Sequence, residues 1–186
     1  MAKLTRISVV VLILVLSPLA LSAAEKETLN KRYSGRFLVV MKEGLAVGIC
    51  TVPAGQRRPL APPELPVRIA AGRSDYQSQS GASATAAGCS TVDPEPLEKG
   101  EVLKVKKVWS RGDEFHISVQ NVSAHRLEAG LDTNLEIGSA DFRFKLSEPK
   151  DLDASAQEIE KWVKPFQSAQ EAAKFGSSAS GAPAKQ

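Results

Sequence analysis

The sequence predicts a mainly β protein with one amphipathic helix near the C-terminus. Three observations lead to this prediction: two alternating segments joined by a glycine turn over 101–122, a third alternating segment over 141–147, and helical spacing of apolar residues between Ile159 and Phe166. A three-stranded sheet with one apolar face must bury that face against another element of the fold. We therefore expect a small, partly open barrel or curled antiparallel sheet, comparable in size to SH3-like and OB-like barrels, with the helix packed over an open end or face.

The first 24 residues have the pattern of a secretory signal peptide. Lys3 and Arg6 give a positive start, an apolar run covers 7–21, and small residues occupy 22–24. The run is shorter than the ~20 residues that a membrane-spanning helix needs, which argues against the alternative of an uncleaved membrane anchor. We expect cleavage at the end of this segment, no stable membrane span in the mature chain, and a secreted or periplasmic location.

The charge of the chain gives no support for nucleic-acid binding. The full sequence has 24 Lys and Arg residues against 21 Asp and Glu residues. Lys3 and Arg6 leave with the signal peptide, so the mature chain has 22 basic residues and a net charge of +1. Nucleic-acid-binding domains carry a clear basic excess, and we therefore expect no nucleic-acid partner.

A β domain is expected over 36–150, after a charged N-terminal linker over 25–35 that holds at most a frayed helical turn. Its first segment, over 36–52, consists of an apolar run, a Lys-Glu-Gly turn over 42–44 and a second apolar run. A continuous apolar run is typical of a strand buried on both faces. We expect a hairpin here that packs across the 101–122 hairpin.

A Pro-, Ser- and Ala-rich insertion over 53–99 interrupts the predicted β domain. Five prolines over 53–66 disfavour sheet pairing, because proline lacks a backbone donor. Residues 72–91 contain Tyr76 as their one large apolar side chain, so they bury too little surface to offset their ordering entropy. We expect a mobile insertion with one short strand at most, over 67–71.

The main hairpin covers 101–122. In its second arm, apolar residues over 115–119 alternate with polar ones, so one face of the strand is apolar. The first arm loses this alternation where Lys106 and Lys107 are adjacent, which predicts a β-bulge. Gly112 can adopt the positive φ that a tight hairpin turn requires.

A third strand is expected over 141–147, where Phe142 and Phe144 alternate with charged residues. The connection before it contains apolar residues over 131–137, which predict a short edge strand.

The C-terminal helix is expected over 151–176. Ser155 and Glu158 have the spacing of a capping box. The apolar face of the helix consists of Ile159, Trp162, Val163 and Phe166. Pro165 predicts a kink or a restart, and the Gly-, Ser- and Ala-rich residues over 177–186 predict a disordered tail.

The two cysteines, Cys50 and Cys89, lie in the part of the chain that is expected to be exported. An even number of cysteines in an oxidising compartment favours a disulfide. A catalytic role for Cys89 is disfavoured, because its low-complexity surroundings cannot hold a general base in a fixed position.

A cationic strand is the one candidate for partner binding in the sequence. The candidate residues are Lys104, Lys106, Lys107, Trp109 and Arg111. They would suit an acidic partner such as anionic lipid or an anionic polymer, or an envelope protein. The alternative, which we favour because acidic residues lie nearby, is a sheet edge that lysines keep from aggregating.

His116 and His125 are the two histidines of the chain. Alternation places His116 on the polar face of its strand, so we expect it to be a solvated surface residue. Neither histidine has cysteines or carboxylates at metal-ligand spacing, and the sequence has no nucleophile elbow and no phosphate-binding glycine loop. We expect no metal, no cofactor and no enzymatic activity.

Three functional hypotheses remain. The leading one is an exported, non-catalytic binding or structural module of the cell envelope. The second is an enzyme or metal-dependent factor that uses His116 or His125. The third is an accessory subunit of a larger envelope complex.

Overall fold

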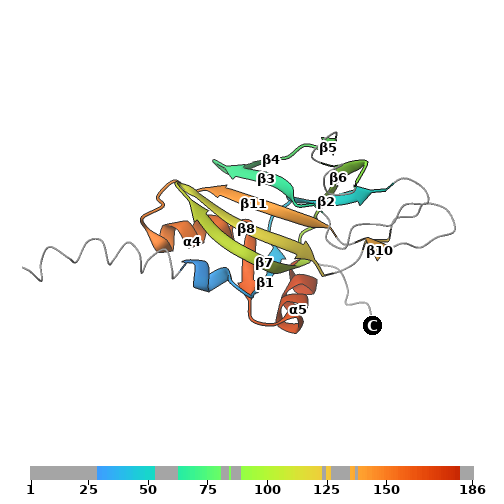
Figure 1. The fold of residues 1–186 in the computed structure, drawn as a ribbon. Coiled ribbons are helices and arrows are strands. Elements are labelled where there is room, and N and C mark those ends of the chain that lie inside the picture. Colours follow the sequence, from blue (N-terminus) through green and yellow to red (C-terminus); the bar gives the residue numbers. More distant parts are fainter. Residues whose placement is uncertain are drawn as a thin grey trace, which may run out of the picture.

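The computed structural model describes residues 29–52, 63–80, 84, 89–122, 125–126, 135–136 and 138–180. The predicted signal peptide over 1–24 lies outside these residues, as does 181–186 of the predicted tail. Within the described part, ten strands form one curled sheet that does not close into a barrel, with helices near the C-terminus (Figure 1). The predicted fold class, a mainly β protein with a partly open antiparallel sheet, is confirmed.

The main hairpin is confirmed. Strands β7 (Val102–Arg111) and β8 (Glu114–Asn121) pair in antiparallel fashion. Their register shifts between Val105 and Lys107, as expected for a β-bulge. Gly112 has a φ of +65° in the turn, a conformation that costs glycine little.

Strand β11 (Ser139–Lys145) is the predicted third strand, and it lies inside the sheet. It pairs antiparallel with β8 on one side. On its other side it pairs with β2 (Ala46–Thr51) through Ser139 and, in parallel, with β3 (Leu65–Ala70). Figure 1 shows β3 running beside β11 along the upper part of the sheet.

The prediction of a hairpin over 36–52 was wrong. Both arms are strands, but β1 (Phe37–Val40) lies between β7 and β12 (Val163–Phe166), whereas β2 lies between β6 and β11. Leu38 and Val40 are fully buried. A strand buried on both faces has no polar side to indicate its neighbours, so the apolar pattern does not specify the pairing.

The prediction that the insertion over 53–99 holds one short strand at most was wrong for the described residues, although β3 overlaps the strand expected over 67–71. Besides β3, this part forms β4 (Arg73–Asp75), β5 (Gln79–Ser80) and β6 (Thr91–Pro96). The residues of β3 that enter the core are Leu65, Val67 and Ile69. Residues 53–62, 81–83 and 85–88 lie outside the described residues.

The prolines of β6 are compatible with its place near the sheet edge. β6 pairs along its whole length with β2. On its other side, β5 reaches only Thr91 and Val92. Pro94 and Pro96 lie beyond the end of β5, where a strand needs no further backbone donor.

The prediction of one helix over 151–176 was wrong in its extent. The segment forms α4 (Leu152–Glu160), then β12, then α5 (Ala169–Ala179). β12 includes Pro165 and pairs with β1 at the end of the sheet, where proline is tolerated. The helix α5 also covers the first residues of the predicted tail.

The predicted capping box does not cap α4. The N-cap is Asp151, whose carboxylate accepts a hydrogen bond from the N–H of Ala154 at 3.0 Å. Ser155 instead donates to the carbonyl of Glu148, and Glu158 accepts from the N–H and hydroxyl of Ser147. Both side chains thus fix the loop that enters the helix.

The predicted linker over 25–35 contributes to the core. Residues 29–33 are helical, and Leu29 and Tyr33 are buried. The ring of Tyr33 lies 5.7 Å from that of Phe115. Arg32 forms an ion pair with Glu160 of α4, which ties this helical turn to the C-terminal part of the chain.

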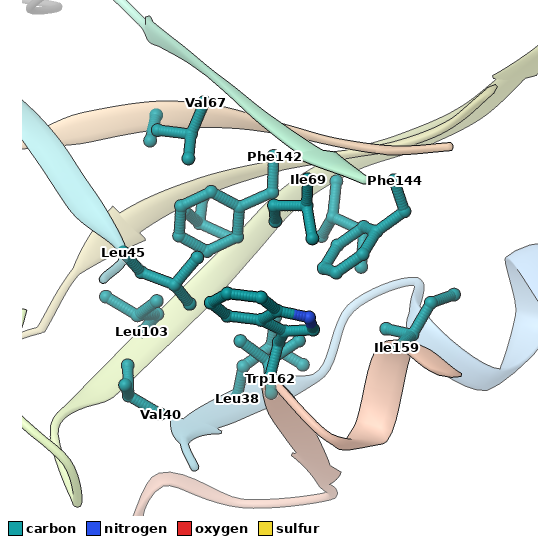
Figure 2. Packing of buried hydrophobic residues seen from close by; sticks show 14 of the residues in the cluster. Leu38, Val40, Leu45, Val67, Ile69, Leu103, Phe142, Phe144, Ile159 and Trp162 are labelled. Atoms are coloured by element: carbon teal, nitrogen blue, oxygen red, sulfur yellow. The ribbon is translucent and has the colours of Figure 1, made fainter. Parts of the chain in front are cut away.

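The core is organised around Trp162, which follows α4 and is 3% exposed. Figure 2 shows its indole ring among side chains from the sheet and from α4. The labelled neighbours include Leu38, Leu45, Phe142, Ile69 and Ile159. Of the four residues predicted as an apolar helix face, Ile159, Trp162 and Val163 are core residues, whereas Phe166 is half-buried. Only Ile159 lies on a helix.

Two smaller predictions concern the cysteines and the 131–137 segment. Cys50 and Cys89 form the predicted disulfide, with Cα atoms 5.5 Å apart. The 131–137 segment contains a short strand, β10 (Leu135–Glu136). This strand pairs with β9 (His125–Arg126) in a separate two-stranded sheet and not with the main sheet.

Candidate functional site

The outer face of β7, β8 and β11 carries polar residues that are unusually well buried. Strand alternation directs Phe115 and Ile117 into the core and His116 and Ser118 to the opposite face. The register then brings Asp141 of β11 opposite Ser118. His116, Ser118 and Asp141 are 5%, 2% and 6% exposed, so these three side chains are covered where solvated ones were expected.

His116 is held by a carboxylate. Its Nδ1 lies 3.2 Å from each carboxylate oxygen of Asp141. Asp141 also accepts a hydrogen bond from Nε of Arg143 at 2.7 Å. Because a carboxylate only accepts hydrogen bonds, Nδ1 of His116 is the donor in this contact.

The other nitrogen of His116 is buried and lacks a hydrogen-bond partner among the described residues. The carboxylate of Glu114 lies near this nitrogen, with its Oε2 3.6 Å from Nε2. Such an orphaned buried atom is uncommon in folded proteins and calls for an explanation.

Trp109 covers His116. The two residues are partners across the β7–β8 ladder, and their rings stack with centroids 4.7 Å apart and an angle of 18° between planes. Nζ of Lys107 lies 5.2 Å from the centre of the Trp109 ring, within the range of a cation–π contact. We call this group, Trp109, Glu114, His116, Asp141 and Arg143, the His116 cluster.

The predicted cationic residues lie on β7, and the structure separates them by partner. Lys106, in the bulge, forms an ion pair with Glu64 at 3.2 Å, and Glu64 also accepts a hydrogen bond from Ser118. Lys107 lies over Trp109. Within the described part of the chain, Lys104 and Arg111 have no ion-pair partner.

The prediction that His116 is a solvated surface residue was wrong. Alternation identified its face correctly, but a neighbouring strand supplied Asp141 and Arg143, and Trp109 shields the ring. Glu64, Asp141 and Arg143 were not identified from the sequence. The only signal was that charged residues alternate in 141–147, and the register that makes them meet His116 depends on a pairing between distant segments.

His125 is not paired with the strands of the His116 cluster, because its backbone belongs to β9 in the small separate sheet. Its side chain lies outside the described residues. Among the residues that are described, no group of three His, Cys, Asp or Glu side chains is arranged to hold a metal ion.

A recess of about 250 Å³ lies at the tip of the main hairpin. Its apolar lining comes from Leu29, Phe115, Leu146 and Leu152. Of the His116 cluster, Glu114 alone lines it. The imidazole therefore does not face the recess.

Comparisons with protein-family models, curated proteins and solved structures find no match to this chain. Among the described helices, none is both long and apolar enough to cross a membrane. The Cys50–Cys89 bond indicates an oxidising compartment outside the cytoplasm.

Proposed function

We propose that this chain is an exported, non-catalytic binding module of the cell envelope whose contact surface is the outer face of β7 and β8. The observation that carries the proposal is the Trp109–His116 stack. An aromatic ring fixed on a sheet face loses little freedom when it meets a ligand, which favours binding.

Export is supported from two directions. The disulfide requires an oxidising compartment, and the sequence over 1–24 has the charge, apolar run and small residues of a signal peptide. Both features support a secreted or periplasmic location, with a mature chain that begins near Glu25.

An anionic ligand suits the charges beside Trp109. Lys107 lies above the ring, and Arg111 and Lys104 have no ion-pair partner among the described residues. All three cations are exposed. The ligand class is an acidic polymer or an acidic segment of an envelope protein, for which unpaired cations give attraction and fast association.

The test is binding of poly-glutamate to the mature protein, measured by tryptophan fluorescence. We expect the Lys107→Ala/Arg111→Ala variant to bind roughly 5- to 30-fold more weakly, since each exposed ion pair contributes about 0.5–1 kcal/mol. The matched control is Lys161→Ala/Lys174→Ala, which removes the same charge from exposed positions elsewhere on the fold. Equal weakening in both variants would show that only net charge matters and would exclude this surface.

An enzyme that uses His116 is the second candidate. The observation in its favour is the Asp141–His116 pair, in which a carboxylate orients the imidazole and Nε2 is left without a partner. Burial of Nε2 under Trp109 argues against it, because a general base must reach its substrate.

Modification by diethyl pyrocarbonate separates the two candidates. For a binding module, we expect His116 to react far more slowly in the folded protein than in urea, as measured by mass spectrometry of its peptide. A rate similar to that of the unfolded chain would mean that Nε2 is reachable and would favour the enzyme.

A further inference from the structure

Within the described part of the chain, strand β7 has an open edge over its second half. β1 pairs with β7 only up to the Phe37–Lys104 pair, and the carbonyl of Arg36 then accepts a hydrogen bond from Val105 at 3.0 Å. Gly35, with a φ of +67°, turns the chain away. Among the described strands, none pairs with 106–111 on the side opposite β8.

The backbone groups of this edge have a defined direction. Arg111 and Glu114 flank the two-residue turn, so they form a hydrogen-bonded pair. Along an antiparallel ladder, hydrogen-bonded pairs alternate with pairs that are not hydrogen-bonded. Trp109 is then hydrogen-bonded to β8 as well. Val108 and Ser110 consequently direct their N–H and C=O groups away from β8, and no described residue bonds to them.

We propose that this edge binds an extended acidic segment of a partner protein by strand addition. The inference rests on the proposed function and specifies its partner. Backbone hydrogen bonds to Val108 and Ser110 would supply affinity, and alternate side chains would supply specificity.

The side chains of β7 define the sequence of the partner. Lys107, Trp109 and Arg111 share the outer face at alternate positions, because their ladder partners Ser118, His116 and Glu114 share it. A strand laid alongside meets them with its own alternate residues. The complementary pattern is acidic, apolar, acidic, with one residue between each.

A second copy of this chain fits the edge poorly. If two copies paired through a two-fold axis at Trp109, each Lys107 would lie opposite Arg111 of the other copy. Like charges directly opposite each other destabilise a strand pair. The cations that protect the edge from its own copies therefore favour an acidic strand.

The experiment uses a short synthetic peptide with Glu, Phe and Glu at alternate positions and Thr between them. Two derivatives carry N-methyl groups on one or the other alternate set of amides. Only one set can face β7, so we expect one derivative to bind the mature protein at least tenfold more weakly and the other to bind within about threefold of the parent peptide. The protein itself is unaltered, so loss of folding cannot produce this result.

Equal binding of the two derivatives, whether both strong or both weak, would overturn strand addition. A peptide with Lys in place of Glu is the charge control and should not bind. If poly-glutamate binds but the peptide does not, strand addition fails and the proposed function stands. If neither binds, the proposed function fails as well. A protein that is dimeric by light scattering without peptide would assign the edge to a second copy instead.

Discussion

Tyr33 is a fully buried residue whose hydroxyl has no hydrogen-bond partner among the described residues. Burial raises the pKa of Tyr33 above its ordinary value of 10.0, and the charge of Glu160 raises it further. The neutral phenol is thus favoured in the folded protein. An unsatisfied buried hydroxyl costs about 1–3 kcal/mol, because it loses its contacts with water and gains none in return.

We predict that Tyr33→Phe keeps or raises the free energy of unfolding at pH 8. The substitution removes the orphaned hydroxyl and keeps the ring contact with Phe115. Urea unfolding of both proteins measures the difference. A loss of more than about 1 kcal/mol would mean that the hydroxyl has a partner after all.

The same substitution has a pH signature. In the unfolded chain Tyr33 ionises near pH 10, whereas in the folded protein its raised pKa keeps it protonated. The unfolded state therefore releases this proton first, and the wild type loses about 1.4 kcal/mol of stability per pH unit above 10. Tyr33→Phe lacks this term. Its stability advantage should be constant below about pH 9 and increase between pH 10 and 11.

At the scale of elements, α5 docks through a contact between two glycines. Ala172 and Gly176 lie one turn apart on its buried side. A Cβ at Gly176 would overlap the carbonyl oxygen of Gly100. Gly100 cannot easily move, because its N–H donates to the carbonyl of Val40 at 2.8 Å.

The substitution Gly176→Ala tests this packing, because helix propensity and the overlap with Gly100 change the stability of the protein in opposite directions. Alanine in an exposed helix position would stabilise the helix by about 1 kcal/mol relative to glycine. Here the overlap with backbone should cost about 1–3 kcal/mol and outweigh that gain. We expect a lower urea midpoint for Gly176→Ala, and little change for Ser178→Ala on the exposed side of α5. A variant more stable than the wild type would contradict the docking.

Elements were predictable from the sequence where one face is polar. Alternation identified β7, β8 and β11, and the adjacent Lys106 and Lys107 identified the bulge. The apolar pattern did not predict β12 as a strand, because Val163 and Phe166 also fit helical spacing from Ile159. The partner strand β1 decided the outcome. Burial of the His116 cluster was not predictable for the same reason, since it depends on the pairing of β8 with β11.

At the scale of the whole molecule, the disulfide was predictable and the topology was not. Two cysteines allow one intramolecular pairing, and it joins the end of β2 to the residues before β6. Closing a loop with a sequence separation of 39 contributes roughly 4 kcal/mol in the chain-entropy model. The parallel pairing of β3 with β11 joins segments more than 70 residues apart, and no local pattern encodes such a contact.

The central place of β11 also sets the order in which the chain can fold. A chain that emerges N-terminus first presents β2 and β3 long before residues 139–145 appear. Until then β3 has only the three residues of β4 as a strand partner among the described residues, and its apolar side chains and one edge stay open. Pairings between such distant segments form slowly. The sheet is therefore completed only after nearly the whole chain has emerged, and before that point its unfinished edges are exposed to other chains.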